Sequence, residues 1–400
     1  METTIKQRTR RDLGQANSLA VFREVLFDAP VPRAEIARRT SLTAASVSRI
    51  TRQLIDAGLV EEFEVHKTGK PGRQLINLRL RSDGGYVVGV SINAFEQRVA
   101  VANLQREMLA ESALPRESVL DPQTSAATAS AAVRSLLKEH RIERRRVFGV
   151  GVASAGVVDP KKGIVLRAPT LGWEAVSFGS ELEGRLGVPV RMSSIPNAIA
   201  AAEHRFGIAR DLQDFLVIHA TLGIGMCMVV DGHLLSGHRG QAGLVGEMQI
   251  SSQGDRGARV TVGLDEIAGG SAIVRRWLGH KAPSMVVRSV RQSQLLQLIE
   301  AANSGDARAN SICDKGARQL GGVVGTIAVS VGSEAVILAG PLINISTYRR
   351  QLESAIKAAM GRERSINILT SERRGIQAAC MLAIGELAAT GSHLHQLLKR

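Results

Sequence analysis

The stretch TAASVSRITRQLIDAGLV, residues 43–60, decides the fold of the first part of the chain. Its apolar residues recur every three or four positions, which is typical of a helix with one buried face. Thr43 is a favourable N-cap residue, and Gly58 is the kind of residue at which helices end. The buried face is expected to consist of Val47, Ile50, Leu54 and Ile55.

Two more helical patterns precede this stretch. The segment NSLAVFREVLFDA, residues 17–29, predicts a helix whose apolar face is formed by Leu19, Val21, Phe22, Val25 and Leu26. The segment PVPRAEIARRTSL, residues 30–42, predicts a short helix that Pro32 opens and that ends before Leu42. The predicted order of helix, helix, turn and helix is that of a helix-turn-helix unit.

The last helix of such a unit enters the major groove of DNA with its first residues at the base edges. Small side chains allow close approach, and a guanidinium binds either guanine or a phosphate. Both types face outward here, so we expect DNA contacts from Thr43, Ala44, Ala45, Ser46, Ser48, Arg49 and Arg52. Whether Arg49 binds a base or a phosphate stays open.

Residues 59–80 alternate in polarity as two strands around the tip KTGKPGR, residues 67–73. This hairpin predicts a basic wing that contacts phosphates or the minor groove through Lys67, Lys70 and Arg73. Units of this shape also mediate protein contacts, and a basic loop is often only a solvated surface. The helix spacing, the small residues and the basic wing together favour DNA binding.

Composition limits the class of protein. A chain of 400 residues, 44% hydrophobic and 22% charged, is globular with more than one domain. Its net charge of +14 favours an anionic partner such as nucleic acid, or reflects a solvated basic surface. The charged N-terminus lacks the apolar core of a secretion signal, and the most apolar run, residues 215–230, is too short and glycine-rich for a membrane span. We therefore expect a cytoplasmic protein with no membrane contact.

The three cysteines carry no motif. Their scatter excludes a disulfide framework and a paired-cysteine metal site, so reduced core residues are expected at Cys227, Cys313 and Cys380. His204 and His219 are likewise expected in the core or on the surface rather than as metal ligands.

From Tyr86 onward, strand patterns alternate with helical ones in two similar sets. The first set contains YVVGVSIN, QRVAVANL, REMLAES and VFGVGVAS, and the second contains FLVIHATLGIGMCMVV and AVILAG. This repetition predicts two α/β lobes with a ligand cleft between them. The expected division is a head at residues 1–82, a first lobe at 83–196 completed by a helix within 376–400, and a second lobe at 197–375.

Several segments together carry a family resemblance. They are RAEIARRTSLTAASVSRITRQLIDAGLVEE, GRQLINLRL, SAGVVD, APTLGW, NAIAAAEHRFG, TLGIG, GLVGE and VILAGPL. In order and spacing, from about Asn17 to the C-terminus, they resemble the ROK family of bacterial repressors and sugar kinases. The resemblance implies a multi-domain α/β chain with a winged helix-turn-helix head and a two-lobed, actin-like body of the ribonuclease-H type.

The resemblance also shows where this chain departs from the family's kinases. Those enzymes keep an Asn-Asp pair, with the Asp as general base, at the positions of Ser194 and Ile195. Isoleucine cannot accept a proton. The aspartate-led D-x-G turn that organises magnesium and phosphates in the family is replaced by Ser91 and Asn93. The resemblance therefore implies no catalytic residue, no cofactor and no kinase activity.

A structural zinc site of many family members is also missing. Alignment on Glu247 and Glu266 places side chains that do not bind zinc at its ligand positions, namely Ile250, Gly257, Arg259 and Leu264. No metal is expected, and the loop of residues 251–263 must keep its shape by other means or stay mobile.

Part of the family's sugar site is retained. Glu247 and Glu266 match carboxylates that accept hydrogen bonds from sugar hydroxyls, and Asn197 matches a further pocket residue. Ile195 and Ile250 make the pocket more apolar, which suits a deoxy or acetylated sugar. The alternative is an empty pocket in which Glu247 caps a helix and Glu266 is a surface charge.

These patterns predict a transcriptional repressor that binds palindromic operator DNA as a homodimer or a dimer of dimers. A sugar-like effector between the lobes would change their closure and with it the spacing of the heads. Two alternatives remain open at this point. One is an ATP-dependent sugar kinase that also binds DNA, and the other is a regulator whose body docks a protein partner.

Overall fold

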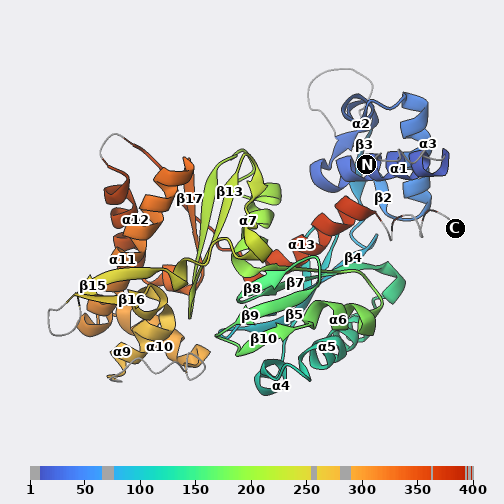
Figure 1. The fold of residues 1–400 in the computed structure, drawn as a ribbon. Helices are drawn as coiled ribbons and strands as arrows, with labels where there is room; N and C mark the ends of the chain where they lie inside the picture. The colour runs from blue at the N-terminus through green and yellow to red at the C-terminus, as the bar shows by residue number, and fades with distance from the viewer. Residues whose placement is uncertain are drawn as a thin grey trace, which may run out of the picture.

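The computed structural model describes residues 10–64, 76–253, 259–279, 290–361 and 364–391, together with residues 394 and 398. The chain forms a small head beside a larger body that is built around two five-stranded sheets (Figure 1). The predicted α/β fold class is confirmed. The predicted residues of the wing tip, Lys67, Lys70 and Arg73, lie outside the described residues.

The head packs helices against a small antiparallel sheet. Its helices are α1 (Arg10–Asp28), α2 (Arg33–Thr40) and α3 (Ala44–Asp56). Its sheet has the order β1 (Val31–Pro32), β3 (Ile76–Leu80) and β2 (Val60–Glu64). The predicted helix-turn-helix and the strands of the wing are thus confirmed, although α1 begins earlier than the sequence pattern suggested.

Helix α3 begins and ends as its sequence predicts. The N-cap hydroxyl of Thr43 accepts a hydrogen bond from the Ser46 N–H at 3.2 Å. Gly58 follows the helix with a φ of +69°, a conformation that favours glycine. The inward face is fully buried at Val47, Ile50 and Leu54, whereas Ile55 is only half-buried at the edge of the head.

The first lobe is built on a mixed sheet with the strand order β11-β7-β4-β5-β6. The strands are β4 (Tyr86–Ile92), β5 (Gln97–Asn103), β6 (Met108–Ala113), β7 (Val147–Ser154) and β11 (Val190–Ser194). One face is covered by α4 (Arg116–Leu120), α5 (Ser125–Glu139) and α6 (Phe178–Leu186). A small sheet that the sequence did not predict follows β7 and contains β8 (Val157–Asp159), β9 (Ile164–Ala168) and β10 (Trp173–Val176).

The second lobe repeats this plan. Its sheet has the order β14-β13-β12-β17-β18, with β12 (Phe215–Ala220), β13 (Ile224–Val230), β14 (His233–Leu234), β17 (Ala335–Ala339) and β18 (Asn367–Thr370). One face packs on α11 (Ala307–Val331) and α12 (Ser346–Met360). The outer part consists of the hairpin β15 (Gln249–Gln253) and β16 (Arg259–Gly263) with α8 (Asp265–Ala268), α9 (Gly270–Trp277) and α10 (Gln292–Asn303).

Helices α7 (Ile195–Phe206) and α13 (Gly375–Thr390) lie between the two sheets and against each other. Helix α13 packs on β4 and β7, and α7 packs on β12 and β13. In Figure 1, α13 runs from between the lobes towards the head. The buried residues of this layer form one hydrophobic core with those of the head. The head is therefore packed onto the body rather than tethered to it.

Glycines permit the close approach of α13 to the first sheet. A Cβ built on Gly151 would stand 1.8 Å from the carbonyl oxygen of Ala379, and one built on Gly89 would stand 2.6 Å from the Cys380 Sγ. The predicted core placement of the cysteines is confirmed, because Cys227, Cys313 and Cys380 are all buried and free. Among the described residues, no helix is both long and apolar enough to cross a membrane.

We predict that Gly151→Ala destabilises the protein by at least about 3 kcal/mol, because the new methyl group would overlap the backbone of α13. Gly385→Ala on α13 is the matched control. Its Cβ would meet nothing within 4 Å, and alanine is favoured over glycine in a helix. Urea unfolding measures both variants, and equal stability of the two would contradict this packing.

Candidate DNA interface and ligand cleft

The predicted DNA-contact residues of α3 form an accessible surface. Residues on this side are exposed at Thr43, Ala44, Ala45, Ser48, Arg49 and Arg52, and Ser46 is half-buried because it contributes to the helix cap. Arg52 pairs with Asp56 at 3.4 Å on the same helix. For Arg49, no carboxylate within ion-pair distance is found among the described residues, so its guanidinium is available to a ligand.

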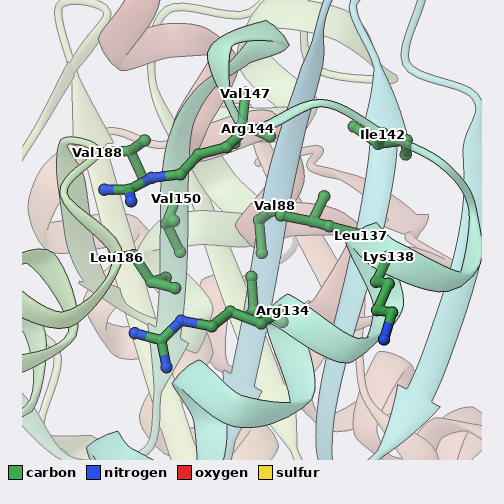
Figure 2. A pocket seen from close by; sticks show the side chains of 11 residues that line it. Val88, Arg134, Leu137, Lys138, Ile142, Arg144, Val147, Val150, Leu186 and Val188 are labelled. Atoms are coloured by element: carbon green, nitrogen blue, oxygen red, sulfur yellow. The ribbon is translucent and has the colours of Figure 1, made fainter.

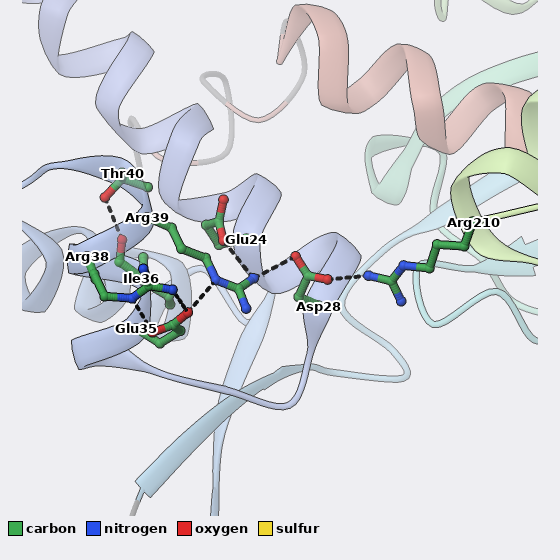
Figure 3. A network of polar contacts seen from close by, with 8 residues as sticks. All are labelled: Glu24, Asp28, Glu35, Ile36, Arg38, Arg39, Thr40 and Arg210. Carbon is green, nitrogen blue, oxygen red and sulfur yellow. Dashed lines mark hydrogen bonds and ion pairs between the residues drawn. The ribbon is translucent and has the colours of Figure 1, made fainter. Parts of the chain in front are cut away.

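Other arginines of the head stabilise its fold. Arg33 donates to the Thr51 hydroxyl at 3.0 Å and pairs with Glu62 at 2.7 Å, which joins α2 to α3 and to the wing. Arg38 and Arg39 both bind Glu35, and their hydrogen bonds lower the pKa of this carboxyl group to about 2 (Figure 3). These contacts distinguish the structural arginines from those of α3.

A cavity of about 480 Å³ lies between the lobes. Its first-lobe wall comes from residues 93–95 after β4, residues 155–156 after β7, and Arg167 on β9. The second-lobe wall comes from the turn between β12 and β13, residues 221–226, and from segments around Glu247 and Asp265. Its size falls in the range of small-molecule sites.

The predicted ligand residues are only partly brought together. Glu247 and Glu266 both line the cavity, whereas Asn197 on α7 is half-buried and is not among the lining residues. Glu247 binds Arg167 across the cleft, so a carboxylate of one lobe is paired with a cation of the other. The Glu266 carboxylate accepts from the Gly263 N–H at 3.2 Å.

The sequence analysis missed several polar residues of the cavity, among them Asp265 and His219. Asp265 accepts a hydrogen bond from the Ile224 N–H at 2.7 Å, and burial, with Glu247 and Glu266 nearby, raises its pKa to about 6. His219, expected only in the core or on the surface, also lines the cavity, and burial lowers its pKa to about 4. At neutral pH the cleft therefore offers carboxylates and a neutral imidazole, which suit hydroxyl groups.

The two positions where the family's kinases carry carboxylates lie close together. Ile195 is the first residue of α7, 2% exposed, and borders the cavity. Ser91 is fully buried, and the described residues offer its hydroxyl no hydrogen-bond partner. A Cβ built on Gly375 would stand 2.8 Å from the Ser91 Oγ and 3.6 Å from the Ile195 Cγ2. This end of the cleft is thus small and mainly apolar.

The segment at the family's zinc position is partly described. Residues 249–253 and 259–263 pair as the antiparallel hairpin β15–β16, with Ile250 opposite Val262, and Leu264 is fully buried. Gly257 lies outside the described residues. Within the described ranges, no group of three or more His, Cys, Asp or Glu residues is arranged to hold a metal ion.

A second cavity, of about 290 Å³, lies within the first lobe (Figure 2). Its walls are mainly the apolar side chains of β4, β7 and α5, with cations at Arg134, Lys138 and Arg144. Arg134 donates to the carbonyl of Arg185 at 2.6 Å, and Arg144 lies against Gly187. Both guanidinium groups thus face the C-terminal end of α6, where cations are favoured without any ligand. The cleft between the lobes is the better candidate for a polyol.

Comparisons with known proteins agree with both parts of the structure. The ROK family profile matches residues 87–385. The N-acetylglucosamine repressor of Escherichia coli O6:H1 (strain CFT073) is 27% identical over 330 residues, covering 82% of this chain and 81% of the repressor. A ROK family transcriptional regulator, a homologue of the E. coli MLC protein, has a TM-score of 0.75 at 22% identity and covers 97% of this chain and 100% of its own. A ROK glucokinase from Streptomyces griseus, solved with glucose and AMPPNP, has a TM-score of 0.61 at 23% identity and covers 77% of this chain and 100% of its own.

We predict that Asp265→Asn removes a pH dependence of stability. Because the pKa of Asp265 is raised on folding, the folded protein holds this proton more tightly than the unfolded chain, and wild-type stability falls as the pH rises from about 4 to about 6. The variant should be more stable than the wild type by about 3 kcal/mol at pH 8 and similar at pH 4. Its amide keeps an acceptor for the Ile224 N–H.

Urea unfolding at the two pH values measures this effect. Glu266→Gln controls for the loss of one negative charge beside the same cavity. Parallel pH profiles for the wild type and Asp265→Asn would contradict the burial of this carboxyl group.

Proposed function

The chain belongs to the ROK family, and we propose that within it this protein is a DNA-binding transcriptional repressor whose body binds a sugar and has no kinase activity. The observation that carries the proposal is the exposed, basic outer face of α3 on a complete helix-turn-helix head. The sequence similarity to an N-acetylglucosamine repressor and the fold similarity to a ROK regulator over 97% of the chain support it.

The cleft supports a neutral, hydroxyl-rich effector. Asp265 and Glu247 present carboxylate acceptors, and His219 is uncharged at neutral pH. Ile195 makes one end apolar, which favours a sugar with an acetyl or deoxy group. Glu266 lies at the same cavity and is part of the proposed site. Asn197 stays a weaker candidate because it does not line the cavity.

A change in lobe closure supplies the regulatory step. The Arg167–Glu247 pair joins the lobes, and an effector that donates a hydrogen bond to Glu247 or accepts one from Arg167 competes with this pair. The effector shifts closure only if it binds the closed and open forms unequally. In a homodimer or dimer of dimers on a palindromic operator in the cytoplasm, such a shift changes the spacing of the heads.

We propose the division into a head at 1–82, a first lobe at 83–196 and a second lobe at 197–375, with the C-terminal helix completing the first lobe. The packing of α13 on β4 and β7 supports the last point.

Sugar phosphorylation is the second candidate function, because the body shares its fold with a ROK glucokinase. Ile195 and Ser91 argue against it, since neither side chain can act as a general base at neutral pH or bind magnesium strongly. A coupled assay for ADP release with ATP, magnesium and a panel of hexoses decides the matter. Turnover of any of these sugars would support kinase activity and contradict the proposal that the body has none.

We predict that Arg49→Ala weakens operator binding about tenfold to a hundredfold, because it removes a guanidinium contact to a base or phosphate. Arg318→Ala on α11 is the control, since this arginine is also exposed but lies in the second lobe. The operator comes from genomic fragments selected by the purified protein at two salt concentrations, because non-specific binding weakens with salt. If Arg49→Ala binds the operator with unchanged affinity, the assignment of α3 as the helix that contacts DNA is refuted.

A thermal-shift panel identifies the effector class. N-acetylglucosamine, glucose and xylose are the first probes, and a ligand of the folded state raises the apparent melting temperature. Stabilisation that disappears in Asp265→Asn would place the ligand in the cleft. A protein-docking role for the body gains support if a broad sugar panel has no effect.

A further inference from the structure

Helix α7 reaches from the cleft to the head. Its first residues, Ile195 and Pro196, line the cavity together with Ser194 before them. Its 12 residues span about 18 Å, and Phe206 at its end lies against α1 of the head. One rigid element therefore touches both the cleft and the head.

Aromatic and cationic side chains join the end of α7 to the end of α1. The rings of Phe206 and Phe27 lie 5.7 Å apart, and the Arg205 guanidinium stacks 4.4 Å from the centre of the Phe27 ring. Arg106, from the turn after β5, lies 5.1 Å from the Phe206 ring and donates to the Leu26 carbonyl at 3.2 Å. The contact thus combines stacking with a hydrogen bond to the last turn of α1.

A chain of ion pairs continues from this contact into the DNA-binding unit (Figure 3). Arg210, which follows α7, binds one carboxylate oxygen of Asp28 at 2.5 Å. Arg39 on α2 binds the other oxygen at 2.9 Å and also binds Glu35 at 2.6 Å. Asp28 is therefore shared between the body and the helix that precedes the recognition helix.

The same end of α7 is fixed within the body. Glu203 is 4% exposed and binds the Ser371 hydroxyl and, at 3.2 Å, the Arg373 guanidinium. Its second oxygen accepts from the Ile208 N–H at 3.1 Å. Ser371 and Arg373 stand just before α13, so Glu203 joins this end of α7 to the start of α13, and Leu19 of the head packs at the C-terminal end of α13. Burial of the Glu203 charge is tolerated because these donors surround it.

We propose that α7 transmits the state of the cleft to the orientation of the head, through Phe206 and Arg210 at its far end. The proposal rests on the proposed function, in which the cleft binds an effector and the head binds DNA. A displacement of Pro196 by an occupant of the cleft moves the Phe27 and Asp28 contacts, since the helix between them resists bending.

A methyl group added beside the cleft end of α7 tests the proposal without any ligand. A Cβ built on Gly225 of β13 would stand 3.1 Å from the Pro196 Cγ, so Gly225→Ala must shift one of them by a few tenths of an ångström. Gly149→Ala on β7 is the matched control. Its Cβ would stand 3.2 Å from the Pro189 carbonyl oxygen, and neither residue lines the cleft or belongs to α7.

Two readouts follow the shift in the full-length protein. One is hydrogen exchange of the amides in residues 24–28 of α1, and the other is the Kd for the selected operator fragment. We expect Gly225→Ala to change the exchange and to alter the Kd about threefold or more, and Gly149→Ala to change neither. Equal effects of the two variants would overturn the proposal.

A second set of variants tests whether the contacts at the far end of α7 carry the effect of Gly225→Ala to the head. The double variant Phe206→Ala and Arg210→Gln removes the contact between the two rings and the Arg210–Asp28 ion pair but leaves the Arg205–Phe27 contact, and in it the effect of Gly225→Ala on the Kd should become smaller. Arg318→Gln is the control, because Arg318 is 61% exposed and Arg210 is 58% exposed, yet Arg318 pairs with Asp314 on α11. If the Kd changes caused by Gly225→Ala and by the double variant simply multiply when the substitutions are combined, coupling through this contact is excluded.

The outcomes separate the two proposals. If the wild type binds no selected DNA fragment, the proposed function fails and the exchange measurement alone decides the coupling. Unchanged exchange in Gly225→Ala then overturns the role of α7. Hydrogen exchange of the β7 and β12 segments checks that each variant keeps the body folded.

Discussion

The close packing of α13 on the first sheet is the constraint on which the rest of the structure depends. Gly89 and Gly151 leave no side chain between the helix and the strands, so the helix backbone is held against β4 and β7. Because α13 also contacts α7 and α1, this one placement sets the position of the second lobe and of the head. Interiors are close-packed and transmit strain, so neither lobe shifts without affecting this layer.

Much of the architecture was predictable from the sequence because its signals are local. Helix α3 shows its period, its N-cap and its terminal glycine within residues 43–58, and all three are confirmed. The strand patterns of β4, β5, β7, β12 and β17 are equally self-contained. The sheet of β8 to β10 was missed because its strands are short and are defined by pairing with one another rather than by a repeating apolar pattern.

The site was harder to predict because side-chain direction depends on tertiary packing. Asp265 and Glu266 are neighbours with similar side chains, yet packing buries the Asp265 carboxylate and leaves Glu266 exposed. Asn197 shares α7 with Ile195, but two residues correspond to about 200° of helix rotation and place it away from the cavity. The pairing of Glu247 with Arg167 joins residues 80 positions apart, which no local pattern reveals.

Ile195 bears on two of the proposals, the lack of kinase activity and the connection between the cleft and the head. Its side chain belongs to the same hydrophobic core as Phe22 of the head and Cys380 of α13. An ionised carboxylate at this position would need a cation or water beside it and would not join an apolar core at low cost. An isoleucine instead lets the first turn of α7 pack tightly between the sheets. The proposed loss of kinase activity and the proposed coupling of cleft and head thus both depend on the side chain at this position.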